Sequence, residues 1–250
     1  MIIAQNLTGA TSYTQRFECS AQKLGIKANG VLKTDIENAY ITILLVDSQG
    51  QQKVITPRTR LGDLMEIAAS NTGMTQIKQN YSSGSIASYD YMGTIELSNY
   101  GSVDLSGGYG QIQLDNCVST STFNLFGIDS QKLTKMIIDY RPLWSAANQY
   151  KETDINAAYA IAIPVSNLVE LQLQYINGRT VIYKPDELKL ICQEINEIAE
   201  VIQNIDNKGA TDVVVGFKNL FCIGVTDCVS MRVQYTADST FYKISDTILQ

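Results

Sequence analysis

Carboxylate side chains are the residues of this chain that could carry out chemistry. Two acids placed across a sugar bond are sufficient for glycoside hydrolysis, because one donates a proton and the other acts as base or nucleophile. Acidic residues occur together in four segments: Asp35/Glu37, Asp63/Glu66, Glu152-Thr153-Asp154 and Asp186/Glu187. Nothing in their spacing forces two segments together, so a carboxylate-dependent glycosidase or lyase remains an alternative and not the main hypothesis.

Histidine is absent from all 250 residues. Its absence excludes Ser-His-Asp and Cys-His nucleophile systems, the HExxH zinc site and histidine acid–base chemistry at neutral pH. Asp186 and Glu187 stand at the start of an expected helix, where the helix dipole favours negative charge, so we interpret them as capping residues. We therefore expect no enzymatic activity and no catalytic residues.

Metal and cofactor sites are also weakly indicated. Asp35, Asp154 and Asp227 lie near turns and could ligate Ca²⁺ through oxygen atoms, but no EF-hand spacing is present. The segment Gly107-Gly108-Tyr109-Gly110 lacks the Gly-Lys-Ser/Thr ending of a phosphate-binding loop and leads into a strand, so we interpret it as a turn. We expect no bound cofactor, with Ca²⁺ as the one alternative.

A polar segment rich in tyrosine is a further candidate for binding. Its tyrosines are interspersed with Ser, Asn and Gly, a composition typical of antibody and sugar-binding surfaces. Interfaces between protein subunits are also enriched in tyrosine, so a loop packed on a neighbouring molecule is the alternative interpretation. The tyrosines are Tyr81, Tyr89, Tyr91, Tyr100 and Tyr109.

Charge and composition indicate protein partners more than nucleic acid. The formal net charge is −6 and the sequence pI is about 4.7, whereas phosphate binding requires clustered Lys and Arg. Charged residues make up only 18% of the chain, below the roughly 25% of soluble globular domains. A surface with so little charge is suited to wide protein contacts, and we expect no direct binding of nucleic acid.

Cysteine usage and the N-terminal sequence indicate folding in a reducing cytoplasm. The five cysteines include no CxxC pair, so neither a zinc ribbon nor a redox motif is supported. Cys117 and Cys228 lie in apolar segments, and we expect both in the core. The N-terminal residues lack a basic and apolar signal, and no apolar run is long enough to cross a bilayer. The cysteines are Cys19, Cys117, Cys192, Cys222 and Cys228.

Short strands with alternating polarity dominate the sequence. Many such strands bounded by turn residues predict a mainly β sandwich or barrel. Two segments show helical spacing instead, one from Leu61 to Ala68 and one from Leu188 to Ile205, each after a strand hairpin. The predicted strands are Tyr40 to Val46, Lys53 to Thr56, Thr94 to Leu97, Gly110 to Leu114, Ala158 to Ile163, Leu168 to Tyr175, Thr180 to Tyr183, Thr211 to Phe217 and Val229 to Tyr235.

The order of these segments repeats along the chain, which predicts an internal duplication. Gly50 and Gly178 match at an offset of 128, while Leu61 and Leu188, like Val54-Ile55 and Val181-Ile182, match at an offset of 127. Cys117-Val118-Ser119 and Cys228-Val229-Ser230 match at an offset of 111, which places about 16 additional residues in the first copy.

The duplication divides the chain into two tandem β-sandwiches, each with an amphipathic helix. The first covers residues 1–135, with an insertion of a loop or hairpin near residues 70–93, and the second covers residues 136–250. Trp144 lies in the connection between the copies, and we expect it to anchor the interface of the two halves.

This duplicated order resembles the double jelly-roll major capsid proteins of tailless icosahedral phages with an internal membrane, of the corticovirus or the finnlakevirus type. The residues that carry the resemblance run in order along both copies. They are Gly30-Val31, Asp35-Ile36-Glu37-Asn38 leading into Tyr40 to Val46, Asp47-Ser48-Gln49-Gly50, Leu61-Gly62-Asp63-Leu64, Tyr159-Ala160-Ile161-Ala162-Ile163, Leu168 to Gln174, Ile176-Asn177-Gly178 and Met231 to Tyr235.

The resemblance implies a virion coat protein, synthesised in the host cytoplasm, whose two jelly rolls stand side by side. Three chains would form a trimer of pseudo-hexagonal outline that tiles an icosahedral shell, in contact with neighbouring capsomers and other virion proteins. The base of the shell would face the internal viral membrane. A vertex or spike protein, or a receptor-binding module with the same fold, is the alternative.

Overall fold

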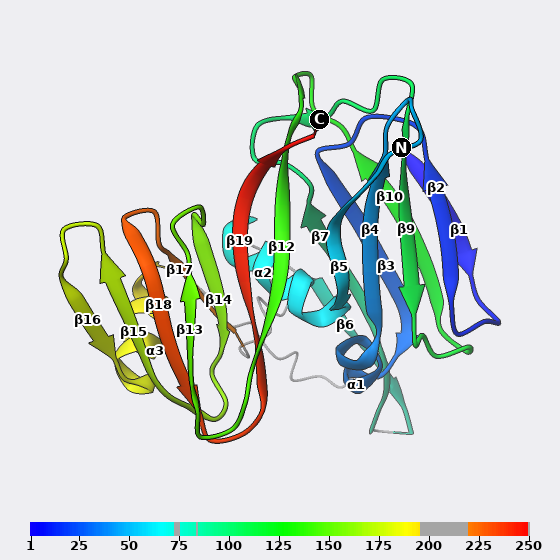
Figure 1. The fold of residues 1–250 in the computed structure, drawn as a ribbon. Coiled ribbons are helices and arrows are strands. Elements are labelled where there is room, and N and C mark those ends of the chain that lie inside the picture. The colour runs from blue at the N-terminus through cyan, green and yellow to red at the C-terminus, as the bar shows by residue number, and fades with distance from the viewer. Residues whose placement is uncertain (73–75, 84, 196–219, 250) are drawn as a thin grey trace. The chain divides into compact units, whose positions relative to one another are not determined.

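The computed structural model describes the whole chain except residues 73–75, 84, 196–219 and 250 (Figure 1). These described residues are mainly β-strands, arranged in antiparallel sheets with three helices. They divide into two compact units, one formed by residues 1–138 with the C-terminal end from residue 248, the other by residues 139–195 and 220–247. Each unit is a sandwich of two sheets.

The first unit contains a five-stranded sheet in the order β1-β10-β3-β7-β6 and a four-stranded sheet in the order β2-β9-β4-β5. A short parallel pair, β8 (Ser102–Val103) and β11 (Leu133–Thr134), lies outside them. The other elements are β1 (Ile2–Leu7), β2 (Tyr13–Phe17), β3 (Lys23–Val31), α1 (Lys33–Asn38), β4 (Tyr40–Val46), β5 (Gln52–Arg60), α2 (Leu61–Thr72), β6 (Gln76–Ser82), β7 (Ser85–Glu96), β9 (Tyr109–Asp115) and β10 (Thr122–Ile128).

The second unit contains two four-stranded sheets, in the orders β12-β19-β14-β17 and β13-β18-β15-β16. Its one described helix, α3, follows β16, just as α2 follows β5. The elements are β12 (Met136–Ser145), β13 (Tyr150–Asp154), β14 (Ala160–Pro164), β15 (Leu168–Tyr175), β16 (Thr180–Tyr183), α3 (Pro185–Ile195), β17 (Leu220–Gly224), β18 (Cys228–Tyr235) and β19 (Ser239–Ile248).

Both units have the same topology. If β6 and the short pair are set aside, each has eight strands, and one sheet orders them first, eighth, third, sixth. The other sheet orders them second, seventh, fourth, fifth. This winding of eight strands into two sheets is a jelly roll. The chain is therefore two tandem jelly rolls, each with a helix between its fifth and sixth strands, and the predicted fold class is confirmed.

Alternating polarity in the strands builds the core of each roll. In β9, every second residue is buried, including Ile112 and Leu114, and β10 buries Phe123 and Leu125 in the same way. In the second roll, Leu171 and Leu173 of β15 lie in one cluster with residues of β14, β18 and β19. Burying one face of each sheet against the other removes apolar surface from water, which is the main stabilising term of a sandwich.

The helices follow the predicted periodicity where they are described. In α2, the expected apolar residues are fully buried: Leu61, Leu64, Met65, Ile67 and Ala68. The predicted helix from Leu188 to Ile205 is described as α3 only up to Ile195, and the rest of that prediction lies outside the described residues, as does the predicted strand from Thr211 to Phe217. Helix α1 was not expected, since Asp35 to Asn38 was assigned to the approach to a strand.

Strand pairing corrects the alignment of the two copies. Leu44 of β4 pairs with Val54, and Gln172 of β15 pairs with Ile182, so this hairpin repeats at an offset of 128 in both of its strands. The predicted offset of 127 for Val54 is therefore too short by one. Because side chains alternate between faces, a shift of a single residue would exchange the buried and exposed positions of the strand.

The predicted match of Cys117 with Cys228 is wrong. Cys117 follows β9, whereas Cys228 is the first residue of β18, the strand equivalent to β9. Leu44 also pairs with Gln111, and Gln172 pairs with Arg232, so Gln111 and Arg232 are equivalent at an offset of 121. The offset falls from 128 to 121, so the first roll carries 7 additional residues between these strands instead of 16. Residues 76–82 of the expected insertion form β6, which pairs with β7 as a hairpin.

Candidate functional site

The outer face of sheet β13-β18-β15-β16 in the second roll carries a cluster of polar side chains. Residues of β15 that alternate with the buried Leu171 and Leu173 point away from the core. Register places them in three rows across the sheet, with partners on β13 and β18 in every row and on β16 in two of them. The rows are Tyr150, Gln234 and Glu170; Glu152, Arg232, Gln172 and Ile182; and Asp154, Ser230, Gln174 and Thr180.

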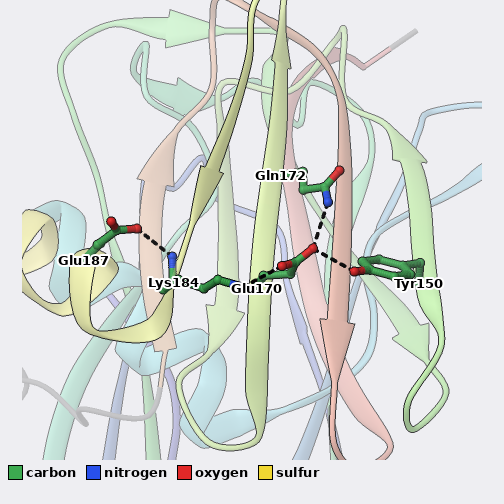
Figure 2. Close-up of polar contacts among 5 residues, drawn as sticks. All are labelled: Tyr150, Glu170, Gln172, Lys184 and Glu187. Atoms are coloured by element: carbon green, nitrogen blue, oxygen red, sulfur yellow. Dashed lines mark hydrogen bonds and ion pairs between the residues drawn. The ribbon is translucent and has the colours of Figure 1, made fainter.

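Glu170 is the centre of this face (Figure 2). Its Oε1 accepts hydrogen bonds from the Tyr150 hydroxyl and from Gln172 Nε2, both at 2.8 Å. Lys184 Nζ lies 2.6 Å from Oε2 and completes an ion pair. The Glu170 side chain is only 12% exposed, although it lies on an outer sheet face, because these neighbours cover it. The cluster ties β13, β15 and the residue that precedes α3 together.

Electrostatics keep this carboxylate ionised. Lys184, then Tyr150 and Gln172, donate hydrogen bonds that favour the charged form and lower the pKa of Glu170 to about 2. The hydrogen bond between Lys184 and Glu170 also raises the pKa of Lys184 above its ordinary value. A carboxylate that accepts three donors and has a depressed pKa is a poor general acid or base near neutral pH. The geometry supports a structural role for Glu170, not proton transfer.

The start of α3 confirms the interpretation of Asp186 and Glu187 as capping residues. The backbone N–H of Lys184 donates to Glu187 Oε2 at 2.8 Å, the reciprocal half of a capping box. Both acids lie in the first turn, where the helix dipole favours negative charge. Asp186 Oδ1 also lies 3.2 Å from Lys189 Nζ, one turn further along.

The other acidic candidates are distributed over several elements. Asp35 and Glu37 belong to α1, where Asp35 Oδ2 accepts the backbone N–H of Leu32 at 2.7 Å. Asp63 and Glu66 belong to α2, and Glu66 is buried. Glu152 and Asp154 lie on the edge strand β13. Within the part of the chain that the structure describes, no group of three or more Cys, Asp or Glu side chains could hold a metal ion.

The glycine-rich segment is a turn followed by a strand, as predicted. Gly107 has φ +75°, and Tyr109 is the first residue of β9. Beside it, a cavity of about 300 Å³ is lined by Asp47, Asp104 and Lys135, among others. Asp47 Oδ1 already accepts the N–H groups of Gln49 and Gln51, both at 2.8 Å, and Asp104 accepts that of Ser106 at 3.0 Å. These two acids therefore stabilise loops.

The tyrosines proposed as one binding cluster have different environments. Tyr91 is fully buried, with its ring centroid 5.9 Å from that of Tyr89. Tyr100 is 47% exposed, and Tyr109 lies under the guanidinium of Arg16. Burial raises the pKa of Tyr91 well above its ordinary value. A single exposed surface made of these tyrosines is therefore not formed, because inward positions of β7 belong to the core. The environment of the Tyr81 side chain lies outside the description.

Trp144 lies on β12 and is 59% exposed. Its expected role as an anchor between the two halves stays a prediction. Cys117 and Cys228 are both buried, as expected, and burial raises the pKa of Cys117 to about 12. Among the described helices, none is long and apolar enough to span a bilayer.

Arginine–tyrosine stacks lie on the outer face of sheet β2-β9-β4-β5 in the first roll and of sheet β13-β18-β15-β16 in the second. In the first roll, the guanidinium carbon of Arg58 lies 3.6 Å from the ring centroid of Tyr40, and that of Arg16 lies 3.7 Å from the Tyr109 ring. In the second roll, Arg232 lies 3.9 Å from the Tyr150 ring. Neither these stacks nor the Glu170 cluster was predicted. Alternation in Leu168–Tyr175 indicated which residues face outward, but strand neighbours are set only by the topology.

Comparisons with known proteins identify the fold. No protein-family model matches this chain. No curated protein sequence matches it either. A chain from the atomic structure of Sulfolobus turreted icosahedral virus is similar over 100% of this chain and 89% of its own length, with a TM-score of 0.55 and 9% identity. The whole double jelly roll is thus shared with a chain of an icosahedral virus.

Two further structures give much weaker similarity. HutD from Pseudomonas fluorescens has a TM-score of 0.22 and 9% identity, over 98% of this chain and 87% of that one. Quercetin 2,3-dioxygenase from Acinetobacter baumannii has a TM-score of 0.23 and 8% identity, over 96% of this chain and 71% of that one. Such low TM-scores carry no argument about fold or activity.

Proposed function

We propose that this chain is a major capsid protein of an icosahedral virus. The observation that carries the proposal is the presence of two jelly rolls with identical strand order in one chain, similar over their full length to a chain of an icosahedral virus. Each chain contributes two equivalent rolls, so a trimer contains six similar modules. Six similar modules are what a pseudo-hexagonal outline requires. Such trimers could tile a closed shell.

The composition supports the partners that this function requires. Only 18% of the residues are charged, and the net charge is −6. Charge depletion is typical of the buried centres of protein interfaces, and a net negative chain has no electrostatic drive to bind nucleic acid. We accordingly propose contacts with neighbouring capsomers, other virion proteins and an internal viral membrane at the base of the shell, in a coat without enzymatic activity or resident cofactor.

The first experiment is the mass of the purified native protein by light scattering, over a wide range of concentration. A species of three times the 27.6 kDa chain mass, with a hexagonal outline in negative-stain images, is the expected result. A chain that remains monomeric at the highest concentration would contradict the proposal.

Copy number in purified particles separates a coat protein from the vertex, spike or receptor-binding alternative. A major coat protein is the most abundant protein of the particle, whereas a vertex protein is confined to the few vertices. Lipid analysis of the same particles tests the internal membrane, and particles without lipid would contradict that part of the proposal.

A further inference from the structure

The outer faces of sheets β2-β9-β4-β5 and β13-β18-β15-β16 each carry an aliphatic residue at the same position. Val54 of β5 pairs with Leu44, and Ile182 of β16 pairs with Gln172, so the two residues are equivalent at the offset of 128. Each is 51% exposed. Each also lies on the last strand of its sheet among the described residues. Each outer face therefore presents a half-exposed aliphatic side chain at the same position, which is available for an apolar contact.

Charges around these two residues are opposite in the two rolls. On the first roll, Arg16, Arg58 and Arg60 lie on the outer face, because Arg16 pairs with Gln111, Arg60 pairs with Tyr40, and Arg58 stacks on Tyr40. Asp115 also lies on that face, paired with Tyr40 from the other side, and Glu18 forms an ion pair with Arg16. The first face is therefore predominantly basic.

The second face is predominantly acidic. Glu152, Asp154 and Glu170 lie on it, together with the two basic residues Arg232 and Lys184. Lys184 is already paired with Glu170. The acids Glu152 and Asp154 lie on the exposed edge strand β13, where Glu152 is opposite Arg232 and Asp154 Oδ1 accepts the backbone N–H of Asn156 at 2.9 Å.

One pair of equivalent positions shows the reversal directly. Arg16 pairs with Gln111 in the first roll, and Glu152 pairs with Arg232 in the second. Since Gln111 and Arg232 are equivalent, Arg16 and Glu152 are equivalent too. The side chain of Arg16 is 56% exposed, and that of Glu18, its ion-pair partner at 3.0 Å, is 71% exposed. Exposed pairs of this kind contribute little and can be exchanged for a partner across an interface.

We propose that the outer face of sheet β2-β9-β4-β5 of one copy docks on the outer face of sheet β13-β18-β15-β16 of the next copy. Val54 and Ile182 contribute the apolar contacts, and Arg16 and Arg58 face the acids of β13. This inference rests on the proposed coat function and assigns its contact surfaces. Contact between two different faces is head-to-tail, which closes a ring of chains when the rotation permits. If either face instead docked on the same face of a second chain, like charges would lie together, which is unfavourable.

Aspartate substitutions at the two aliphatic residues test the contact. Val54→Asp and Ile182→Asp are each expected to raise the dissociation constant of the trimer at least tenfold. The melting temperature of the dissociated single chain should stay unchanged, because both positions are half exposed there. The matched controls are Leu133→Asp and Leu190→Asp, at positions that are 56% and 63% exposed outside these faces. Light scattering and analytical ultracentrifugation give the dissociation constants.

Charge reversal gives a second test that does not depend on apolar residues. Arg16→Glu with Arg58→Glu is expected to weaken the trimer at least tenfold, as is Glu152→Arg with Asp154→Lys. Combining all four substitutions restores opposite charges in every contact, so the trimer is expected to recover. Melting temperatures of all variants are measured in parallel to identify any that unfold.

The outcomes separate this inference from the coat proposal. Trimers that persist in both aspartate variants and both charge-reversed variants would overturn the assigned surfaces and leave the coat function standing. Failure of the fourfold variant to recover, when both double variants remain folded, would also overturn them. A wild-type chain that never associates overturns both proposals together.

Discussion

Gly50 and Gly178 occupy the same turn of the two jelly rolls, at the shared offset of 128. Their φ angles are +83° and +81°. Gly50 donates its N–H to the carbonyl of Asp47 at 3.1 Å, and Gly178 donates to that of Tyr175 at 2.9 Å. The two hairpins therefore share strand register, backbone conformation and hydrogen bonds. This agreement in detail supports duplication of one ancestral roll.

Alanine at either glycine is expected to destabilise its roll through backbone conformation alone. Nothing lies within 4 Å of an added Cβ at either position, so no collision is involved. The left-handed conformation costs an L-residue about 1–2 kcal/mol, and we expect Gly50→Ala and Gly178→Ala to lower the free energy of unfolding by that amount in urea titrations. Asparagine, which tolerates this conformation better, should cost less at both positions; equal losses for the two substitutions would argue against the assigned angles.

Alanine at Gly108 is expected to be destabilising for a different reason. A Cβ there would collide with the backbone carbonyl oxygen of Val46, which cannot rotate away as a side chain would. We expect Gly108→Ala to lower the free energy of unfolding by about 2–4 kcal/mol, within the range of severe packing defects. Gly224→Ala is the control, since its nearest atom would be 3.9 Å away. Similar melting temperatures for the two variants would contradict the close approach at Gly108.

Two leucines of α3 provide a matched pair for the packing of the helix. Leu188 is 1% exposed and belongs to the core of the second roll, whereas Leu190 is 63% exposed. Leu188→Ala should lower the free energy of unfolding by about 2–5 kcal/mol because it removes buried methyl groups and leaves a cavity. Leu190→Ala should change it by less than about 0.5 kcal/mol. The reverse ranking in chemical denaturation would show that the assigned helix face is wrong.

Glu170 should make stability depend on acid pH. Its pKa falls from an ordinary value of 4.5 to about 2 in the folded chain. A depressed carboxylate pKa contributes stability that is fully present above pH 4.5 and is lost as the pH falls through about 2. Glu170→Gln should therefore be less stable than wild type at neutral pH, and the difference should shrink over that window. Melting temperatures between pH 7 and pH 2 measure it.

Asp227→Asn is the control, because this exposed acid lies in the turn before β18 and outside the proposed contact faces. Its melting temperature at neutral pH should stay within error of the wild-type value. A Glu170→Gln variant whose difference from wild type stays constant down to pH 2 would contradict the depressed pKa.

Strong alternation or helical spacing made part of the fold predictable. The predicted strand from Tyr40 to Val46 is β4, the one from Leu168 to Tyr175 is β15, and the buried face of α2 is as expected. These segments have one buried face along their whole length, so their pattern of apolar and polar residues is regular. Strands such as β1 and β3 were not predicted, because glycine, lysine or bulges interrupt their alternation.

The candidate surfaces were less predictable than the fold. The sequence placed Asp186 and Glu187 at a helix start, which depends only on local backbone chemistry and is confirmed. The Glu170 cluster combines Tyr150, Gln172 and Lys184, which come from separate segments of the chain. Their meeting depends on β13 and β15 both flanking β18.

The sequence by itself determined the β-rich class, the order of hairpin and helix in each half, and the absence of histidine chemistry, because these depend on composition and on local periodicity. Only the tertiary structure decided that Cys117 and Cys228 are not equivalent, that Trp144 is exposed, and that Val54 and Ile182 share a position. Each of those depends on which strands are neighbours and in what register. Register is a long-range property, and a shift of one residue moves every side chain of a strand to the opposite face.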